Sequence, residues 1–192
     1  MPPKKKYTKQ QIIDKAFEIA REEGISSITV RKVADRLNSS TAPIYVNFED
    51  VEELIEGIIE KTFAISKQIL NNQNSGQPFK DIGLASIKFA REYPILFQEI
   101  IMSQDDYMED YDQNLGEALI EKMKKAPQLE DFSELELKKI LLKMRIFQTG
   151  LSVMVSNNLF EEDLDEEKEV KLLDEIAEDI VLATRMRKEG KL

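Results

Sequence analysis

The sequence contains no cysteine, no histidine and no tryptophan in its 192 residues. Without cysteine there are no disulfides or thiol nucleophiles, and without histidine there are no imidazole general bases and few of the usual ligands of zinc and iron. Carboxylates remain, but no D-x-D-x-D-G loop or glycine-rich phosphate loop accompanies them. We therefore expect no enzyme, no catalytic residue, no metal site and no cofactor.

Long apolar runs are also missing. The longest are far shorter than a membrane span, and the N-terminal segment MPPKKKYTKQ has no apolar stretch after its lysines, as a secretory signal would. The sequence thus predicts no membrane partner and a cytoplasmic location. The lack of cysteine is compatible with a reducing compartment.

Charge is unevenly distributed along the chain. Residues 1–48 hold nine Lys and Arg against five Asp and Glu, a net charge of +4, which leaves −14 for the remainder of a chain whose total is −10. A basic head on an acidic body is expected when only the head approaches a polyanion such as DNA. We interpret Lys4, Lys5 and Lys6 as a DNA-contacting arm, with a solubilising tail as the alternative.

Residues 29–48, TVRKVADRLNSSTAPIYVNF, combine two short helical patterns around a polar turn. In the first pattern Thr29 is the predicted N-cap, and Arg31 and Lys32 direct positive charge outward. Apolar residues at i, i+3, i+4 and i+7 line one side of this helix, namely Val30, Val33, Ala34 and Leu37. Asn38-Ser39 then interrupts the periodicity and suits a turn.

The second pattern begins at Ser40, its predicted cap, and has Pro43 in the first turn, where a missing amide costs little. Ile44 and Phe48, four residues apart, can pack inward. The opposite side carries no acidic residue and presents Thr41, Ala42, Tyr45 and Asn47. Small and hydrogen-bonding residues suit a helix that enters the major groove of DNA. The alternative is an ordinary helix-turn-helix connection of a helical protein.

The other helices follow from caps and apolar spacing. Thr8 with Gln11 forms a capping box for a first helix that Gly24 ends, which completes a three-helix head. Asp50 with Glu53 begins a long helix, and further helices are predicted at 79–92, 95–102, 115–125, 133–155 and 166–188. No strand pattern occurs. We predict an all-α fold of about nine helices, with a DNA-binding domain at 1–49 and a helical dimerisation domain at 50–192, to which the family resemblance described below adds ligand binding.

The last two helices suggest a partner subunit. The first is apolar almost all round in its second half and the other carries a narrow apolar seam, so both need cover. Two helices from each subunit would form a four-helix interface in a homodimer, and paired heads would read a two-fold operator. The predicted interface residues are Phe147, Leu151, Met154, Leu173, Ile176, Ala177, Ile180, Val181 and Thr184. The alternative is that the seam packs on the chain's own core.

From Gly24 to Leu54 the chain resembles the TetR family of bacterial one-component transcriptional regulators. The resemblance lies in G-x-x-x-x-TVRKVADRL, in PIYVNF and in FEDVEEL, and a weaker one in the RIFQTGLSVMV helix. It implies that Thr29, Ser40, Thr41 and Tyr45 contact phosphates or seat the helices, while Thr41, Ala42, Pro43 and Asn47 face the groove. Asn38-Ser39 replaces the family's glycine-plus-aliphatic pair, and Val51 replaces a lysine, so affinity should depend more on the lysine arm.

The resemblance also implies a small-molecule effector in a pocket within the body. Aromatic, methionine and polar candidates for its lining are Phe63, Phe89, Phe97, Met102, Tyr107, Tyr111, Met144, Phe147 and Gln148. Aromatic and methionine residues at helical spacing can equally be ordinary core. The acidic residues 105–110 beside two tyrosines could favour a cationic ligand, although a solvated loop explains them as well.

The resulting prediction is a repressor that binds a palindromic double-stranded DNA operator as a homodimer and is released by a small molecule. One alternative keeps the fold but gives the body a protein partner in place of a small ligand. A second alternative, a helical hydrolase with carboxylates at 105–112, leaves the basic head without a purpose.

Overall fold

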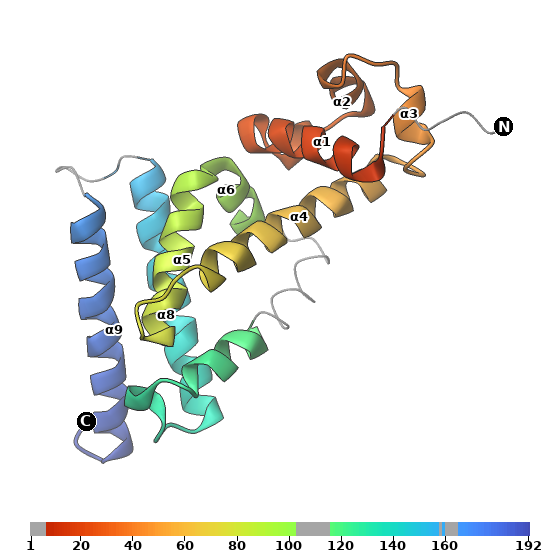
Figure 1. Ribbon diagram of the computed structural model, residues 1–192. Helices are drawn as coiled ribbons and strands as arrows, with labels where there is room; N and C mark the ends of the chain where they lie inside the picture. The colour runs from red at the N-terminus through yellow and green to blue at the C-terminus, as the bar shows by residue number, and fades with distance from the viewer. Residues whose placement is uncertain (1–6, 103–115, 158, 160–164) are drawn as a thin grey trace. The chain divides into compact units, whose positions relative to one another are not determined.

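The computed structural model describes residues 7–102, 116–157, 159 and 165–192, and every regular element in these ranges is a helix (Figure 1). This confirms the all-α prediction. Lys4, Lys5, Lys6, Tyr107 and Tyr111 lie outside the described residues. The elements are α1 Lys9–Glu23, η1 Ile25–Ser27, α2 Val30–Arg36, α3 Ala42–Tyr45, α4 Val51–Asn71, α5 Pro78–Glu92, α6 Pro94–Met102, a helical segment at 116–123, η2 Pro127–Leu129, α8 Glu134–Ser156 and α9 Glu166–Lys188.

The chain divides into two compact units. The first contains Met1–Gln68 and Tyr93–Ile100, and the second contains Ile69–Glu92 and Ile101–Leu192. The first unit therefore extends beyond residue 49, the boundary expected from sequence. Leu54 and Ile58 of α4 and Leu96 of α6 are fully buried in its core. The three-helix head thus takes part of its core from segments that the sequence assigns to the body.

Local capping explains where the first helices begin. The Thr8 hydroxyl accepts a hydrogen bond from the amide of Gln11, and the Gln11 side chain accepts one from the amide of Thr8, so the predicted capping box is present. Gly24 ends α1 with φ of 93°. The inward face of α1 packs on α2, α3 and α4 through Ile12, Ala16, Phe17, Val33, Ala34, Ile44, Phe48 and Leu54.

Two predicted caps differ from the structure. The N-cap of α3 is Thr41 and not Ser40, and it makes no side-chain capping bond because its backbone is already helical, with φ of −71° and ψ of −16°. At the start of α4 the Asp50 carboxylate accepts from the amide of Glu53 at 2.8 Å, as expected. The Glu53 carboxylate, however, accepts from the amide of Glu49.

The second unit is built around α5, α8 and α9, which pack on one another (Figure 1). Ser133 and Glu136 form a capping box at the start of α8. Between these helices Arg91 of α5 pairs with the fully buried carboxylate of Glu169 of α9 at 2.7 Å. The apolar core includes Ile82, Ile87, Leu119, Ile120, Met123, Leu129, Leu137, Ile140, Met144, Leu151 and Leu173. None of the described helices combines the length and apolar character needed to cross a lipid bilayer.

Candidate nucleic-acid interface

The helix α2 is fixed at its start by Thr29, as predicted. The Thr29 hydroxyl accepts a hydrogen bond from the amide of Lys32 at 3.2 Å. Val33 and Ala34 of this helix are buried against the core of the first unit, which leaves Arg31 and Lys32 exposed on the outer side. Burial of one face therefore orients the two cations toward solvent.

The turn between α2 and α3 is a Schellman motif. The amide of Ser39 donates to the carbonyl of Ala34 at 2.9 Å, and the amide of Asn38 donates to the carbonyl of Asp35 at 3.0 Å. Asn38 occupies the left-handed region, with φ of 50°. Asparagine is the best substitute for glycine in this conformation, so Asn38 provides the turn that a glycine provides in the resembling family.

The candidate reading helix α3 is one turn long and directs Ile44 inward. Ile44 and Phe48 are buried, whereas Tyr45 is 60% exposed and Val46 is 62% exposed. Thr41 and Ala42 at its start are exposed as well. An exposed valine beside small residues suits contact with thymine methyl groups.

Val46 is the exposed residue of this face that the sequence interpretation missed. Helical spacing alone could have indicated it, since residues 42, 45 and 46 lie opposite residues 44 and 48. Ser40 is exposed and Pro43 is half-buried at the same surface. The structure thus brings Ser40, Thr41, Ala42, Pro43 and Tyr45 together on one patch.

Asn47 is placed differently from the other predicted contacts. Its side-chain amide donates to the carbonyl of Pro43 at 2.7 Å and to the carbonyl of Tyr7 at 3.3 Å. The Tyr7 hydroxyl in turn donates to the carbonyl of Leu37 at 2.8 Å. The amide group of Asn47 is therefore used within the protein, and it holds the residue that follows the lysine arm against the helix-turn-helix.

The cationic side chains of α2 differ in whether they form ion pairs. Lys32 pairs with Glu23 at 2.8 Å, and Arg36 pairs with Glu22 at 2.7 Å. The hydrogen bond from Arg36 lowers the pKa of the Glu22 carboxyl. Arg31 makes no ion pair or hydrogen bond with any residue in the described part of the chain. Exposed pairs are weak, so Lys32 can exchange Glu23 for a phosphate, while Arg31 is available without exchange.

A carboxylate from outside the helix-turn-helix holds the segment that leads into α2. Glu99 of α6 accepts hydrogen bonds from the amide of Ile25 at 2.5 Å and from the hydroxyl of Ser26 at 2.8 Å. A Cβ added at Gly24 would lie 2.5 Å from a Glu99 oxygen, so glycine is needed there for this approach as well as for its positive φ. No sequence signal pointed to Glu99, because it lies more than seventy residues from its partners.

The predicted ligand-lining residues are spread over both units. Phe63 and Phe97 belong to the first, and Phe89, Met144, Phe147 and Gln148 belong to the second. Phe89, Phe97, Met144 and Gln148 are buried, whereas Phe63 and Phe147 are half-buried. The helix α6 ends at Met102.

The exposed face of α3, the Schellman turn and the capped α2 together form a helix-turn-helix, the motif of many DNA-binding proteins. The family described as bacterial regulatory proteins, tetR family, matches residues 12–58. The uncharacterized HTH-type transcriptional regulator YvkB of Bacillus subtilis (strain 168) is 25% identical over an alignment of 130 residues, and the match covers 61% of this chain and 66% of that protein. The match thus spans just under two thirds of YvkB.

A solved structure supports the fold over a longer stretch. A Clostridium perfringens protein named as a fatty acid metabolism regulator aligns with a TM-score of 0.58 and 18% identity, covering 88% of this chain and 96% of its own. Residues 12–58 thus match the DNA-binding domain of the tetR family of bacterial regulatory proteins, and the chain as a whole is similar in fold to a solved regulator.

Proposed function

We propose that this protein is a ligand-responsive repressor that binds a palindromic operator as a homodimer and leaves it when a small molecule binds the body. The observations that carry the proposal are the exposed patch of α3 and the exposed Arg31 of α2, which has no ion-pair partner among the described residues. Thr29, Arg31, Lys32, Ser40, Thr41 and Tyr45 would contact phosphates, and Ala42, Pro43 and Val46 would contact bases. Such a repressor acts where the DNA is, in the cytoplasm.

The charge distribution supports approach of the head alone. The first 48 residues carry +4 and the remainder −14, so the body is repelled by DNA while the head is attracted. Lys4, Lys5 and Lys6 directly precede Tyr7, which is tied to Leu37 in the turn. Tyr7, the residue that follows these lysines, is therefore tied to the helix-turn-helix.

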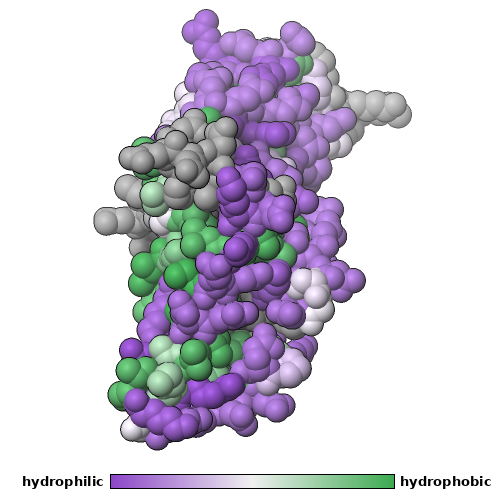
Figure 2. All heavy atoms as spheres, turned by 90° about the vertical axis from the view of Figure 1, so that its left-hand side faces the viewer, coloured by the Kyte–Doolittle hydropathy of each residue, from purple (hydrophilic) through white to green (hydrophobic). Residues whose placement is uncertain are grey.

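The proposed dimer face lies on α8. Leu142 is 58% exposed and Ile146 is 66% exposed, and Leu135 and Met154 extend the same stripe. Gly150 lies exposed within this stripe, and a Cβ added there would meet no atom within 4 Å. An exposed glycine inside a long helix costs stability unless it allows close approach of a partner helix. Figure 2 views the molecule from the side on which α9 lies and shows hydrophobic surface among the hydrophilic residues.

The predicted interface residues divide into two groups. Leu151 and Leu173 are buried in the chain's own core, because α8 and α9 pack on α5 through them, so they are not available to a partner. The half-buried residues of the predicted interface also pack against that core, namely Phe147 of α8 and Ile176, Ala177, Ile180 and Val181 of α9. Met154 is exposed and Thr184 is partly exposed. The seam on α9 is thus largely used within the chain, and the exposed stripe of α8 is the better candidate.

The route from body to head runs through α6. This helix begins in the first unit and ends in the second, and Glu99 within it holds the amides of η1. A ligand that favours one position of α6 over another would shift η1 and the start of α2, and so change the affinity for an operator. A groove of about 610 Å³ in the second unit supports a small molecule as the ligand rather than a protein partner on a closed body.

The DNA-binding part of the proposal is tested by selection from a pool of random duplexes, followed by salt titration of the selected sequence. We expect a palindrome and a steep salt dependence. Arg31→Gln should lower the salt slope by about 1, because one phosphate contact is lost. Lys67→Gln, which changes an exposed cation of α4, is the control and should leave the slope unchanged. Failure to enrich any sequence at low salt would contradict the proposal.

The dimer is tested by sedimentation of Leu142→Lys and Ile146→Lys variants. We expect these variants to be monomeric, because a partner would have to bury an unpaired charge. Leu159→Lys places the same substitution at an exposed leucine outside α8 and should remain dimeric. A wild-type protein that sediments as a monomer at all concentrations would overturn this part of the proposal.

A further inference from the structure

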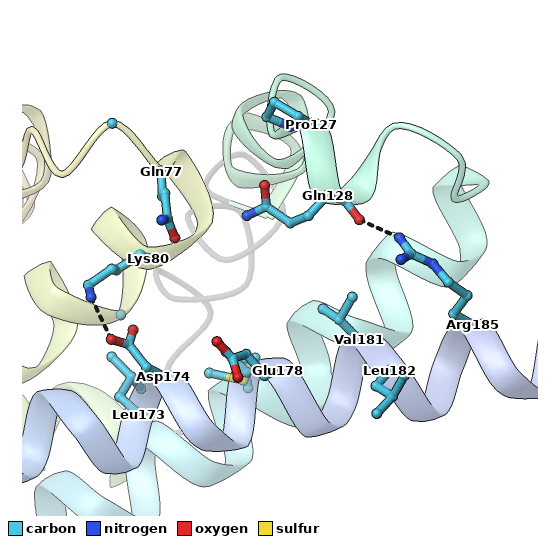
Figure 3. A pocket seen from close by; sticks show the side chains of 14 residues that line it. Gln77, Lys80, Pro127, Gln128, Leu173, Asp174, Glu178, Val181, Leu182 and Arg185 are labelled. Atoms are coloured by element: carbon cyan, nitrogen blue, oxygen red, sulfur yellow. Dashed lines mark hydrogen bonds and ion pairs between the residues drawn. The ribbon is translucent and has the colours of Figure 1, made fainter.

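A groove of about 610 Å³ opens in the second unit between the start of α5, η2 and the middle of α9. Figure 3 shows Lys80 and Gln77 on one side, Gln128 on another, and a row of α9 side chains below them. Of the ligand-lining residues predicted from sequence, Met144 alone is among the described residues that line this groove. The groove is therefore a different site from the pocket that the family resemblance implies.

The floor of the groove is apolar. Met144 and Leu173 are buried beneath it, and Ala177 and Val181 continue the surface along α9. Gly83 of α5 lies directly on Leu173, and a Cβ at Gly83 would collide with that side chain. An apolar group of several carbon atoms can therefore bind on this floor. Its binding free energy would grow with the apolar area that it buries.

Four charged residues lie at the polar rim of the groove, and three of them make an ion pair or a hydrogen bond. Lys80 pairs with Asp174 at 2.5 Å. Arg185 donates to the carbonyl of Gln128 at 2.9 Å and lies 5.5 Å from the centre of the Phe132 ring. Glu178 has no ion pair and no hydrogen bond with any residue of the described ranges. In Figure 3 its carboxylate stands between Asp174 and Val181, on the side of α9 that faces the groove.

We propose that this groove binds an amphipathic organic cation, with the charged group beside Glu178 and the apolar part on the floor. A cation completes the pairing of Glu178, whereas an anion would meet two carboxylates on the same face of α9 and cations that already have partners. The field of the molecule acts in the same direction, because residues 49–192 carry a net charge of −14.

This proposal rests on the proposed function only in naming the class of effector, and binding can be measured without DNA. The probes are tetraphenylphosphonium and tetraphenylborate, which share their shape and apolar surface and differ in the sign of their charge. By isothermal titration of the full-length protein we expect the phosphonium to bind more tightly. Equal affinities, or tighter binding of the borate, would overturn the proposal.

Two variants test whether the carboxylate of Glu178 binds the cation. Glu178→Gln should weaken phosphonium binding by about fivefold, as expected for loss of one partly solvated ion pair, and should leave borate binding unchanged or stronger. Asp179→Asn changes the next acidic residue of α9, which does not line the groove, and should have no effect. Equal loss in both variants would mean that the net charge alone attracts the cation, and would overturn the site.

A tryptophan introduced at the rim tests whether the phosphonium binds in the groove. The chain has no tryptophan, so Leu182→Trp at the exposed rim introduces a single indole whose fluorescence should respond to the phosphonium. An unchanged signal under saturating phosphonium would show that it binds elsewhere. If the phosphonium binds in the groove but does not release the selected operator, the binding site stands and the effector role fails. If no operator is selected at all, the proposed function fails independently of the groove.

Discussion

The carboxylate of Glu99 accepts a hydrogen bond from the backbone amide of Ile25 at 2.5 Å, across more than seventy residues of sequence. Ser26 donates its hydroxyl to the same carboxylate at 2.8 Å. Both donors belong to η1, which ends at Ser27, shortly before the N-cap of α2 at Thr29. A side chain of α6 therefore holds the element that leads into the helix-turn-helix.

Glu99→Ala should destabilise the first unit by about 1–3 kcal/mol, because the partly buried amide of Ile25 loses its acceptor. Operator affinity should also fall, although Glu99 is not on the DNA-binding face. The measurements are urea unfolding and operator titration. Glu92→Gln, an exposed glutamate at the end of α5, is the control. Unfolding and affinity both equal to wild type would show that Glu99 does not hold η1.

Tyr7→Phe should weaken operator binding without removing any DNA contact. The phenol donates to the carbonyl of Leu37 in the turn, and its loss frees the segment that carries the lysine arm. We expect a stability loss of about 1 kcal/mol and a lower affinity at low salt. Deleting residues 1–6 should remove most of the difference in affinity between Tyr7→Phe and wild type. If the difference persists in the truncated protein, Tyr7 acts on the helices rather than on the arm.

The Arg91 and Glu169 pair predicts a strong effect in the second unit. Arg91→Met leaves a fully buried carboxylate without its cation and should cost about 2–3 kcal/mol in the free energy of unfolding. Arg91→Met combined with Glu169→Leu should recover much of that loss, because no uncompensated charge remains. Thermal or urea unfolding of the single and double variants checks this. Additive losses would mean that the two charges do not compensate each other.

Asp14 and Lys61 predict a pH dependence in the first unit. The hydrogen bond from Lys61 lowers the pKa of the Asp14 carboxyl. A lowered pKa in the folded state contributes stability above the unfolded value of about 4, and this contribution is lost as the pH falls through the folded value. The pair is partly exposed, so its contribution at pH 7 is about 0.5 kcal/mol.

Asp14→Asn should therefore be less stable than wild type at pH 7 and should approach it below about pH 3. Unfolding in urea across this range measures the difference. A difference that stays constant from pH 7 to pH 2 would show that the Asp14 charge is not its source.

Short-range features were predicted well from the sequence. The capping box of Thr8 and Gln11, the cap at Thr29 and the stop at Gly24 are all present, because each depends on residues within one helical turn. The inward direction of Ile44 and Phe48 also followed from spacing. The cap at Ser40 was wrong, since the chain is already helical at Thr41 and makes no side-chain capping bond there.

Sequence by itself determined the helical class, the helix-turn-helix and the separation of charge, because periodicity, caps and charge can be read along the chain. Tertiary structure decided which of these residues remain available. It buried Leu151 and Leu173 within the chain's own core, used Asn47 to hold Tyr7, and brought Glu99 to η1. Such pairings depend on which faces meet when helices distant in sequence pack together, and that information is not local to any segment.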